Sequence, residues 1–363
     1  MSARSDGVRC LLIRGGTSKG AYFVADDLPA DPVDRDELLM RLLGTPDPRQ
    51  IDGLGGAHPL TSKVAIVSRS SRSDVDLDYL FLQIGVEHAT VSDRQNCGNL
   101  LAGVGQFALE RGLIAVSEGQ LHFAAVPIYM VNTDSIATAY FQIVDGMPNY
   151  SGGTRIDGVP GTAAEVRLEF DDIAGGSCGA LLPTGNAVDT LDDLEVTLID
   201  NGMPVVIVRA SDLGKSGYET PDELETDQQL CQRIESIRRA AGPMMKLGDV
   251  ADTTVPKITL VSAPINNGTI NTRTFIPHRC HEAIGVFGAV SVATAALLPN
   301  SPAASVARLG GHPSRIVCEH PTGTFTVVID ATSRSDGTLT VHHAGIIRTA
   351  RKLMDGICFP RDT

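Results

Sequence analysis

The chain has 363 residues, of which 42% are hydrophobic, so it is long enough for two domains with packed cores. Its formal net charge is −13 and only 4% of its residues are aromatic, which argues against a nucleic acid or an anionic membrane as partner. No apolar run reaches the roughly 20 residues that span a bilayer. The polar N-terminus lacks the apolar core of a signal peptide, so we expect a cytoplasmic protein.

Seven cysteines are spread over the chain, an odd number with no C-x-x-C pair. Neither a disulfide framework nor a zinc ribbon is indicated, and we expect free thiols in a reducing compartment. His278, Cys280 and His281 cluster, but their spacing matches no standard ligand set, so we predict no metal site. We expect Cys178 and Cys280 to be packing residues.

The first half is predicted to be β-rich around one helix that carries a cysteine. Strands are expected at 8–13, 21–24, 62–67, 77–86, 124–130 and 136–144, and a helix at 34–43. A glycine-rich turn at 14–20 lacks phosphate-loop spacing and fits a small carboxylate better than a nucleotide. Lys63 opens a strand directly after a loop, where a solvated edge residue is the ordinary alternative to a functional one.

Cys97 lies where a polar segment runs into an amphipathic helix. Asn96 is a plausible N-cap, which would place Cys97 in the first helical turn, among free backbone N–H groups. Such a position favours the thiolate and holds a carboxylate nearby. A small buried cysteine at a helix start is the competing interpretation.

The second half repeats this plan. Strands are expected at 164–170, 194–199, 204–209, 257–263, 321–329 and 338–347, with helices at 221–241 and 284–293 and a short basic segment at 348–354. In each half a β-rich stretch leads through a polar loop to a glycine-flanked helix start. Two such helix starts facing each other would form an anion-binding cleft between domains.

Several motifs together resemble the PrpF family. They are RGGTSKG at 14–20, LTSKVA at 60–65, QNCGN at 95–99, LPTGN at 182–186 and FIPH at 275–278, and they run in order over nearly the whole chain. Within the family the chain looks most similar to the 4-oxalomesaconate tautomerases and isomerases of gallate and protocatechuate meta-cleavage. QIDG at 50–53, RIDGVPG at 155–161, IDNGMP at 199–204 and LGD at 247–249 support that subgroup.

The resemblance implies an α+β, diaminopimelate epimerase-like fold. Two related domains, expected at 1–184 and 185–363, would each wrap a β-sheet around a central helix, with the active site in the cleft between them. We allow that the last strands or helix pack back on the first domain. A homo-oligomer, most simply a dimer, is expected.

The resemblance also implies a cofactor-independent proton transfer on an unsaturated oxo-tricarboxylate, a small anionic substrate. Lys63 and Cys97 match the family's acid/base pair. The second helix start carries no cysteine, so a two-thiol racemase mechanism is not expected. Residues expected to bind the substrate are Arg14, Thr17, Ser18, Asn96, Gly98, Asn99, Thr184, Gly185, Asn186, Arg273, His278 and Ser291. Arg273 is the favoured anchor, because a guanidinium binds a carboxylate through two hydrogen bonds.

Three functions stay open at this point. The first is a 4-oxalomesaconate tautomerase or allylic isomerase, since both reactions need the same two groups. The second is a methylaconitate-type isomerase of the same family. The third is a non-catalytic accessory protein to a dehydratase, against which the paired Lys63 and Cys97 argue.

Overall fold

A computed structural model describes residues 7–115, 122–171, 173–310, 314–333 and 339–362. The chain divides into two compact units, unit 1 (Met1–Glu169 with Arg348–Thr363) and unit 2 (Phe170–Ile347). This division falls earlier than the expected boundary after residue 184. The reason is local: the amides of Ser177 and Cys178 donate to the carboxylate of Asp200 at 2.8 and 2.9 Å, which ties this loop to unit 2.

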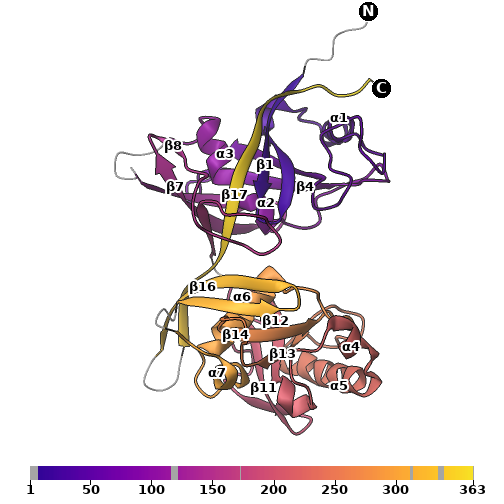
Figure 1. The fold of residues 1–363 in the computed structure, drawn as a ribbon, viewed down its shortest axis with the longest axis vertical. Helices are drawn as coiled ribbons and strands as arrows, with labels where there is room; N and C mark the ends of the chain where they lie inside the picture. Colours follow the sequence, from indigo (N-terminus) through magenta and orange to yellow (C-terminus); the bar gives the residue numbers. More distant parts are fainter. Residues whose placement is uncertain (1–6, 116–121, 172, 311–313, 334–338, 363) are drawn as a thin grey trace, which may run out of the picture. The chain divides into compact units, whose positions relative to one another are not determined.

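Unit 1 is a closed ring of strands around two short helices (Figure 1). Its strands are β1 (Val8–Gly15), β2 (Ser18–Val24), β3 (Lys63–Arg69), β4 (Leu77–Ile84), β5 (Val91–Ser92), β6 (Phe123–Met130), β7 (Ser135–Val144), β8 (Met147–Pro148), β9 (Glu165–Phe170) and the end of β17 (Leu339–Cys358). The ring runs β17-β1-β2-β3-β4-β6-β7-β9 and closes where β9 pairs with β17.

The two faces of this ring are filled differently. Helices α2 (Gly98–Leu101) and α3 (Val104–Glu110) contact β1, β2, β3 and β7 on the inner face. On the outer face α1 (Pro32–Leu43) buries Leu39, Leu42 and Leu43 against the sheet. Asp31 caps α1 by accepting from the amides of Val33 and Asp34, and Gly44 ends the helix in the left-handed conformation.

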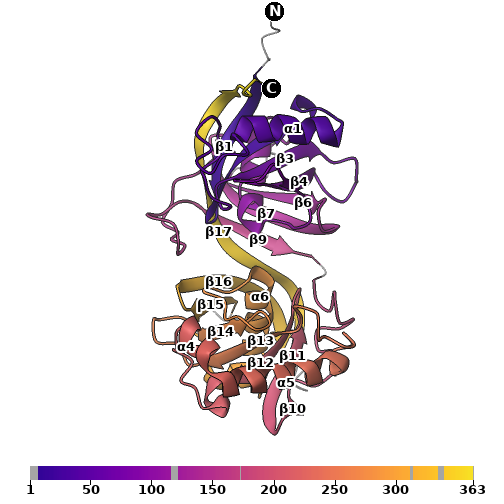
Figure 2. The same cartoon turned by 90° about the vertical axis from the view of Figure 1, so that its right-hand side faces the viewer.

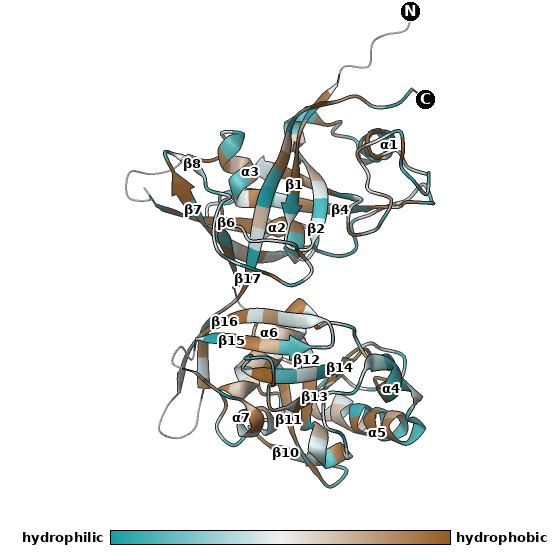
Figure 3. Cartoon of the chain, viewed as in Figure 1, coloured by the Kyte–Doolittle hydropathy of each residue, from teal (hydrophilic) through white to brown (hydrophobic). Residues whose placement is uncertain are grey.

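Unit 2 has the strands β10 (Asp189–Leu191), β11 (Leu194–Asp200), β12 (Pro204–Arg209), β13 (Lys257–Ser262), β14 (Ile270–Phe275), β15 (Arg315–His320), β16 (Gly323–Ser333) and the start of β17. Its helices are α4 (Pro221–Thr226), α5 (Gln228–Met244), α6 (Val286–Ala296) and α7 (Pro302–Val306). The α5 helix is amphipathic and packs on the sheet, whereas the small-residue helix α6 is buried from Gly288 to Ala296; Figure 3 shows α5 with both polar and apolar segments.

Both units use the same order of strand pairings. In unit 1 the hairpin β1–β2 is antiparallel, and the next pairings are β2–β3 parallel, β3–β4 antiparallel, β4–β6 parallel and β6–β7 antiparallel. In unit 2 the hairpin β11–β12 is antiparallel, and the next pairings are β12–β13 parallel, β13–β14 antiparallel, β14–β15 parallel and β15–β16 antiparallel. A surface helix fills the first parallel crossover and a buried helix the second, in each unit. The coarse prediction of a sheet-rich α+β fold is therefore confirmed.

Three details differ from the expected elements. The helix expected at 221–241 is interrupted at Asp227, which is extended and caps α5 through the Leu230 amide. The basic segment at 348–354 is the continuation of one long strand, β17, which passes from unit 2 into unit 1 and pairs with β1 (Figure 2); residue 338 of the expected strand lies outside the described residues. Finally, the strands β5, β8, β10, β14 and β15 and the helix α7 were not expected.

Candidate functional site

Lys63 is the first residue of β3 and is buried, with 7% of its surface exposed. Its Nζ donates a hydrogen bond to Oε1 of Gln83 at 2.8 Å and lies 4.8 Å from the ring centroid of Phe81. Both contacts come from the inner face of β4. The Lys63 amine is therefore held by a neutral amide oxygen and an aromatic face, and these two groups stand where a carboxylate partner would be usual.

Gln83 is fixed in turn by its own amide group. It faces Lys63 across the β3–β4 pairing, and its Nε2 donates to the carbonyls of Pro59 and Ser62, each at 3.1 Å. These bonds leave Oε1 as the atom that points at Lys63. Sequence reasoning missed Gln83, because its role depends on strand register.

Cys97 is the N-cap residue of α2 and is buried, with 8% exposed. The expectation that Asn96 is the N-cap and Cys97 lies in the first turn is therefore wrong by one residue. Asn96 is used differently: its Oδ1 accepts from the Cys97 amide at 2.7 Å, and its Nδ2 donates to Sδ of Met130 at 2.6 Å. The expected single helix is also divided, since α2 ends at Leu101 and α3 begins at Val104.

Two tyrosines hold the backbone beside Cys97. The Tyr79 hydroxyl donates to the Cys97 carbonyl at 3.2 Å, and the Tyr22 hydroxyl donates to the Leu100 carbonyl at 2.6 Å. Burial raises the pKa of both tyrosines, and a negative charge on Cys97 raises each pKa further. Both therefore remain neutral donors. Tyr79, Phe81 and Gln83 occupy every second position of β4, so their side chains lie on one face of the strand. The contacts of Lys63 and of Cys97 therefore share this face.

Arg348 is a further charged residue of this region that sequence reasoning missed. It is 8% exposed and lies on β17 after the apolar residues Ile346 and Ile347. Burial lowers its pKa to about 10, and the attraction of a negative Cys97 works in the opposite direction. The arginine that directly follows Ile346 and Ile347 was the available signal. The interaction with Cys97 brings this positive charge into the surroundings of the thiol.

The β1–β2 turn packs on the start of α2. Asn99 donates from Nδ2 to Oγ1 of Thr17 at 3.0 Å and to Oγ of Ser18 at 3.4 Å. This close approach needs Gly16, whose φ is +51° and where an added Cβ would lie 2.1 Å from the Asn99 side chain. Because Thr17 accepts from Asn99 and is exposed, its own hydroxyl hydrogen is available to a ligand.

The position next to Cys97 is open on the side where a side chain of residue 98 would point. A Cβ added to Gly98 would meet no atom within 4 Å. No side chain caps the start of α2. Five of the predicted substrate-binding residues (Thr17, Ser18, Asn96, Gly98 and Asn99) therefore come together around Cys97.

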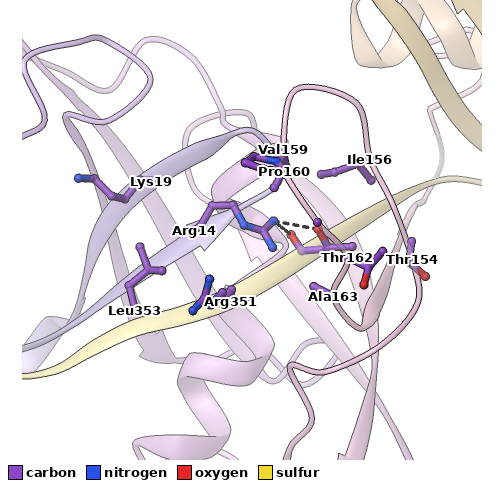
Figure 4. A pocket seen from close by; sticks show the side chains of 12 residues that line it. Arg14, Lys19, Thr154, Ile156, Val159, Pro160, Thr162, Ala163, Arg351 and Leu353 are labelled. Atoms are coloured by element: carbon purple, nitrogen blue, oxygen red, sulfur yellow. Dashed lines mark hydrogen bonds between the residues drawn. The ribbon is translucent and has the colours of Figure 1, made fainter.

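Arg14 belongs to a different place in unit 1. Its neighbour Ile13 faces α2–α3, since a Cβ on Gly103 would lie 3.0 Å from Ile13. Side chains alternate along a strand, so Arg14 points to the outer face of the ring. There it lines a pocket with residues of β17 and of the segment 154–163 (Figure 4). The structure does not join Arg14 to the cluster around Cys97.

In unit 2, Thr184, Gly185 and Asn186 form a turn held by Asp189. The Thr184 hydroxyl donates to one carboxylate oxygen of Asp189 at 2.6 Å, and Nδ2 of Asn186 donates to the other at 2.9 Å. Gly185 adopts φ +82°, which a glycine accommodates without strain. These three residues were predicted together and lie together.

Arg273, the favoured anchor, is committed to the protein backbone. It is 6% exposed, and it donates from Nε to the Glu219 carbonyl at 2.7 Å and from Nη1 to the Thr272 carbonyl at 2.9 Å and Oδ1 of Asn271 at 3.1 Å. Burial lowers its pKa. These bonds give Arg273 a structural role, and its role as a substrate anchor stays a prediction.

Ser291 and His278 also have local partners. The Ser291 hydroxyl is buried in α6, donates to the Met203 carbonyl at 2.7 Å and accepts from the Asn201 amide at 3.1 Å. The His278 side chain is 65% exposed, with Nδ1 3.8 Å from the Glu235 carboxylate. The structure does not bring these two residues together with Arg273.

Cys178 and Cys280 both pack in the hydrophobic core of unit 2. Burial raises the pKa of Cys178 to about 12 and that of Cys280 to about 11, so both thiols stay protonated at neutral pH. Among the described residues, no group of three His, Cys, Asp or Glu side chains is placed to hold a metal ion. None of the described helices is both long and apolar enough to cross a membrane.

Lys257 is the counterpart of Lys63 in unit 2. Lys63 opens β3, which runs parallel to β2, and Lys257 opens β13, which runs parallel to β12. Burial lowers the pKa of Lys257, and its Nζ would lie 3.8 Å from a Cβ placed on Gly285, the N-cap of α6. Sequence reasoning missed this lysine, although both lysines start a strand after a loop.

Comparison with known proteins assigns the family. A sequence model described as "PrpF protein" matches residues 6–360. A 4-oxalomesaconate tautomerase of Pseudomonas putida is 56% identical over 98% of this chain and 97% of its own length, and a (4E)-oxalomesaconate Delta-isomerase of a Novosphingobium species is 54% identical over 98% of each. The solved structure of a methylitaconate-delta-isomerase superposes with a TM-score of 0.87 at 33% identity, covering 99% of this chain and 96% of that one. The chain belongs to the PrpF family.

Proposed function

We propose that this chain is a cofactor-independent isomerase that moves a proton on 4-oxalomesaconate, by keto–enol tautomerisation or by a 1,3-allylic shift. The observation that carries the proposal is the 56% identity, over nearly the full length of both chains, to a protein named 4-oxalomesaconate tautomerase. The placement of Lys63 and Cys97 against one face of β4 supports it, because the reaction needs two acid/base groups near one substrate.

The proposed mechanism uses these two residues as the acid/base pair. Removal of a proton beside the substrate carbonyl gives a dienolate, whose charge spreads over the conjugated system. One residue of the pair takes this proton and the other returns a proton at a different carbon or at oxygen. Gln83 keeps the Lys63 amine oriented, and Arg348 brings a positive charge to the surroundings of Cys97.

The proposed carboxylate contacts of unit 1 come from the turn that packs on α2. Thr17 and Ser18 present hydroxyls, Asn99 orients them, and the open space beside Gly98 admits the substrate. Donors fixed in advance bind a developing negative charge without reorganisation. In unit 2, Thr184, Gly185, Asn186, His278 and Ser291 stay predictions.

We further propose that the fold is diaminopimelate epimerase-like, with two related domains. The same order of strand pairings and the same placement of buried helices in both units support this relationship. The cytoplasmic location, the homodimer and the cofactor-independent reaction stay predictions.

The test follows the ultraviolet absorbance of 4-oxalomesaconate with the wild-type protein, Lys63→Ala and Cys97→Ala, in H₂O and D₂O. Loss of one acid/base group lowers rates by roughly 100- to 10,000-fold. Deuterium incorporated at a single carbon is expected, and its position shows which carbon exchanges its proton. Lys246→Ala and Cys231→Ala, which change an exposed lysine and a half-buried cysteine of unit 2, serve as matched controls.

Normal rates in both Lys63→Ala and Cys97→Ala would contradict the proposed chemistry. Absence of turnover by the wild type would reject this substrate. The next substrate to assay would then be 2-methylaconitate, since a 2-methyl-aconitate isomerase of Shewanella oneidensis is 36% identical over 96% of this chain.

A further inference from the structure

A pocket of about 230 Å³ lies on the outer face of the unit 1 ring, apart from Lys63 and Cys97. Its floor is the β1–β17 pairing, and the segment 154–163 forms its wall (Figure 4). It is lined by Arg14, Lys19, Thr154, Ile156, Val159, Pro160, Gly161, Thr162, Ala163, Thr349, Arg351 and Leu353. Three of these are cationic and none is acidic.

The strand register concentrates the positive charge. Arg14 lies directly opposite Arg351 on β17 and opposite Lys19 on β2, so three cations occupy adjacent positions on one face of the sheet. Like charges in directly opposed positions destabilise a sheet. Burial lowers the pKa of Arg14, and the charge of Arg351 lowers it further. Arg351 is exposed, so water screens part of this repulsion, and an anion bound between Arg14 and Arg351 would offset the rest.

The hydrogen bonds leave donors available in the pocket. Nη1 of Arg14 donates to the carbonyl and hydroxyl oxygens of Thr349, each at 2.8 Å, and to the Gly16 carbonyl at 3.0 Å. Its Nε and Nη2 have no acceptor among the residues that the structure describes. The Arg351 side chain also has no hydrogen-bond or ion-pair partner in the described part of the chain. In Figure 4 the Lys19 amine points away from Arg14, which leaves Arg14 and Arg351 as the centre of the site.

We propose that this pocket binds a small multivalent oxyanion between Arg14 and Arg351, at a second site separate from Lys63 and Cys97. Two planar guanidinium groups suit carboxylate or phosphate oxygens, because each offers parallel N–H donors. Two sources share this chemistry, inorganic phosphate and a tricarboxylate of the kind that the proposed reaction handles. The second source rests on the proposed function.

The pocket wall also reaches the proposed substrate-binding turn. A Cβ on Gly158 would lie 3.1 Å from Cγ2 of Thr17, so the segment that closes the pocket also contacts the β1–β2 turn. An anion held by Arg14 and Arg351 would therefore fix this segment against both the pocket and Thr17.

The experiment is calorimetric titration of the full chain with inorganic phosphate and, separately, with citrate as a stable tricarboxylate. The variants are Arg351→Gln and, as a matched loss of one positive charge, Arg239→Gln at an exposed position of α5 in unit 2. Arg351→Gln should weaken binding at least about tenfold. Arg239→Gln should bind as the wild type does. Tighter binding of citrate assigns the site to a tricarboxylate, and tighter binding of phosphate assigns it to phosphate.

Equal affinity of wild type and Arg351→Gln would overturn the proposal, as would an equal loss in both variants or no binding of either probe at millimolar concentration. Unfolding temperatures of both variants check that each is folded. Calorimetry needs no turnover, so failure of the proposed isomerase reaction leaves this test intact. If that reaction is confirmed, Arg351→Gln should retain the wild-type rate in phosphate-free buffer.

Discussion

Arg348 brings a buried positive charge to the surroundings of Cys97, and its removal should make that thiol less reactive. In Arg348→Met we expect alkylation of Cys97 by iodoacetamide at pH 7.5 to slow on the order of tenfold, because the attraction between the Arg348 charge and a negative sulfur at Cys97 is lost. The rate is measured by mass spectrometry of the Cys97 peptide.

Arg348→Lys is the matched variant, since it keeps the charge and should restore most of the rate. Alkylation that is equally fast in Arg348→Met and the wild type would separate this residue from Cys97. Because Arg348 is buried, circular dichroism must first show that each variant is folded.

His281 gives unit 2 a pH-dependent contribution to stability. Burial lowers its pKa below the ordinary 6.5, and the charge of Lys257 lowers it further. As the pH falls, the unfolded chain therefore takes up the His281 proton before the folded chain does. The stability that neutral His281 contributes is present above pH 6.5 and is lost as the pH falls from 6.5 to the folded-state pKa. We expect the unfolding temperature of His281→Gln to fall less than that of the wild type between about pH 7 and about pH 5.5.

The exposed His88 supplies the control for this pH experiment, since His88→Gln removes one histidine from the surface of unit 1. Its unfolding temperature should follow the wild-type profile. Identical profiles for His281→Gln and the wild type would show that this histidine does not set the slope.

At the scale of elements, the β1–β2 turn depends on the absence of a side chain at Gly16. Gly16 and Gly146 both have positive φ, +51° and +75°, but a Cβ has no room at Gly16 and meets nothing within 4 Å at Gly146. Alanine should cost about 1–2 kcal/mol at either position through backbone strain. Gly16→Ala should cost more, because it pushes the turn away from Asn99.

The same pair of variants tests the role of the turn in activity. Gly16→Ala should lower kcat/KM on the proposed substrate at least about tenfold, since Thr17 moves with the turn. Gly146→Ala, in the turn between β7 and β8, should leave it unchanged. Equal effects of both substitutions on stability and activity would contradict the close contact with Asn99.

Most elements of the fold were predictable because the pattern of their apolar side chains matches the burial pattern of a strand or a helix. Burial alternates along β6, whereas β1 and β3 contain short continuous apolar runs, and the cap residues of α1 stand in the sequence. The strand β14 was missed because Asn271, Thr272 and Thr274 are polar and yet fully buried. Each of these side chains has a partner that is distant in the sequence: the Gly217 carbonyl, the Glu319 carbonyl and the Thr259 hydroxyl.

The candidate site was predictable to a similar extent and for a related reason. Lys63 and Cys97 stand in short motifs that are visible in the local sequence, as do Thr17 and Asn99. Gln83 and Arg348 act through strand pairing, which no local pattern records. Arg14 was grouped with Thr17 by sequence proximity, but strand alternation sends its side chain to the other face of the ring.

At the scale of the whole molecule, the C-terminal strand links the two units. Residues 339–346 of β17 pair with β16 in unit 2, and from Ala350 to Cys358 the same strand pairs with β1 in unit 1. Closure of the unit 1 ring therefore needs this strand, which pairs with both β1 and β9. A truncation that stops after Ile347 removes this strand and exposes the whole edge of β1.

We expect the chain that ends at Ile347 to leave unit 1 unfolded or aggregated, while a chain that ends at Cys358 keeps the complete β17 and folds. The alkylation of Cys10, fully buried in unit 1, and of Cys318, fully buried in unit 2, gives separate readings of the two units. Rapid labelling of Cys10 with continued protection of Cys318 is the result expected for the shorter chain. Protection of both would show that β1, β2 and β9 hold the ring together without β17, and labelling of both would show that unit 2 does not fold without unit 1.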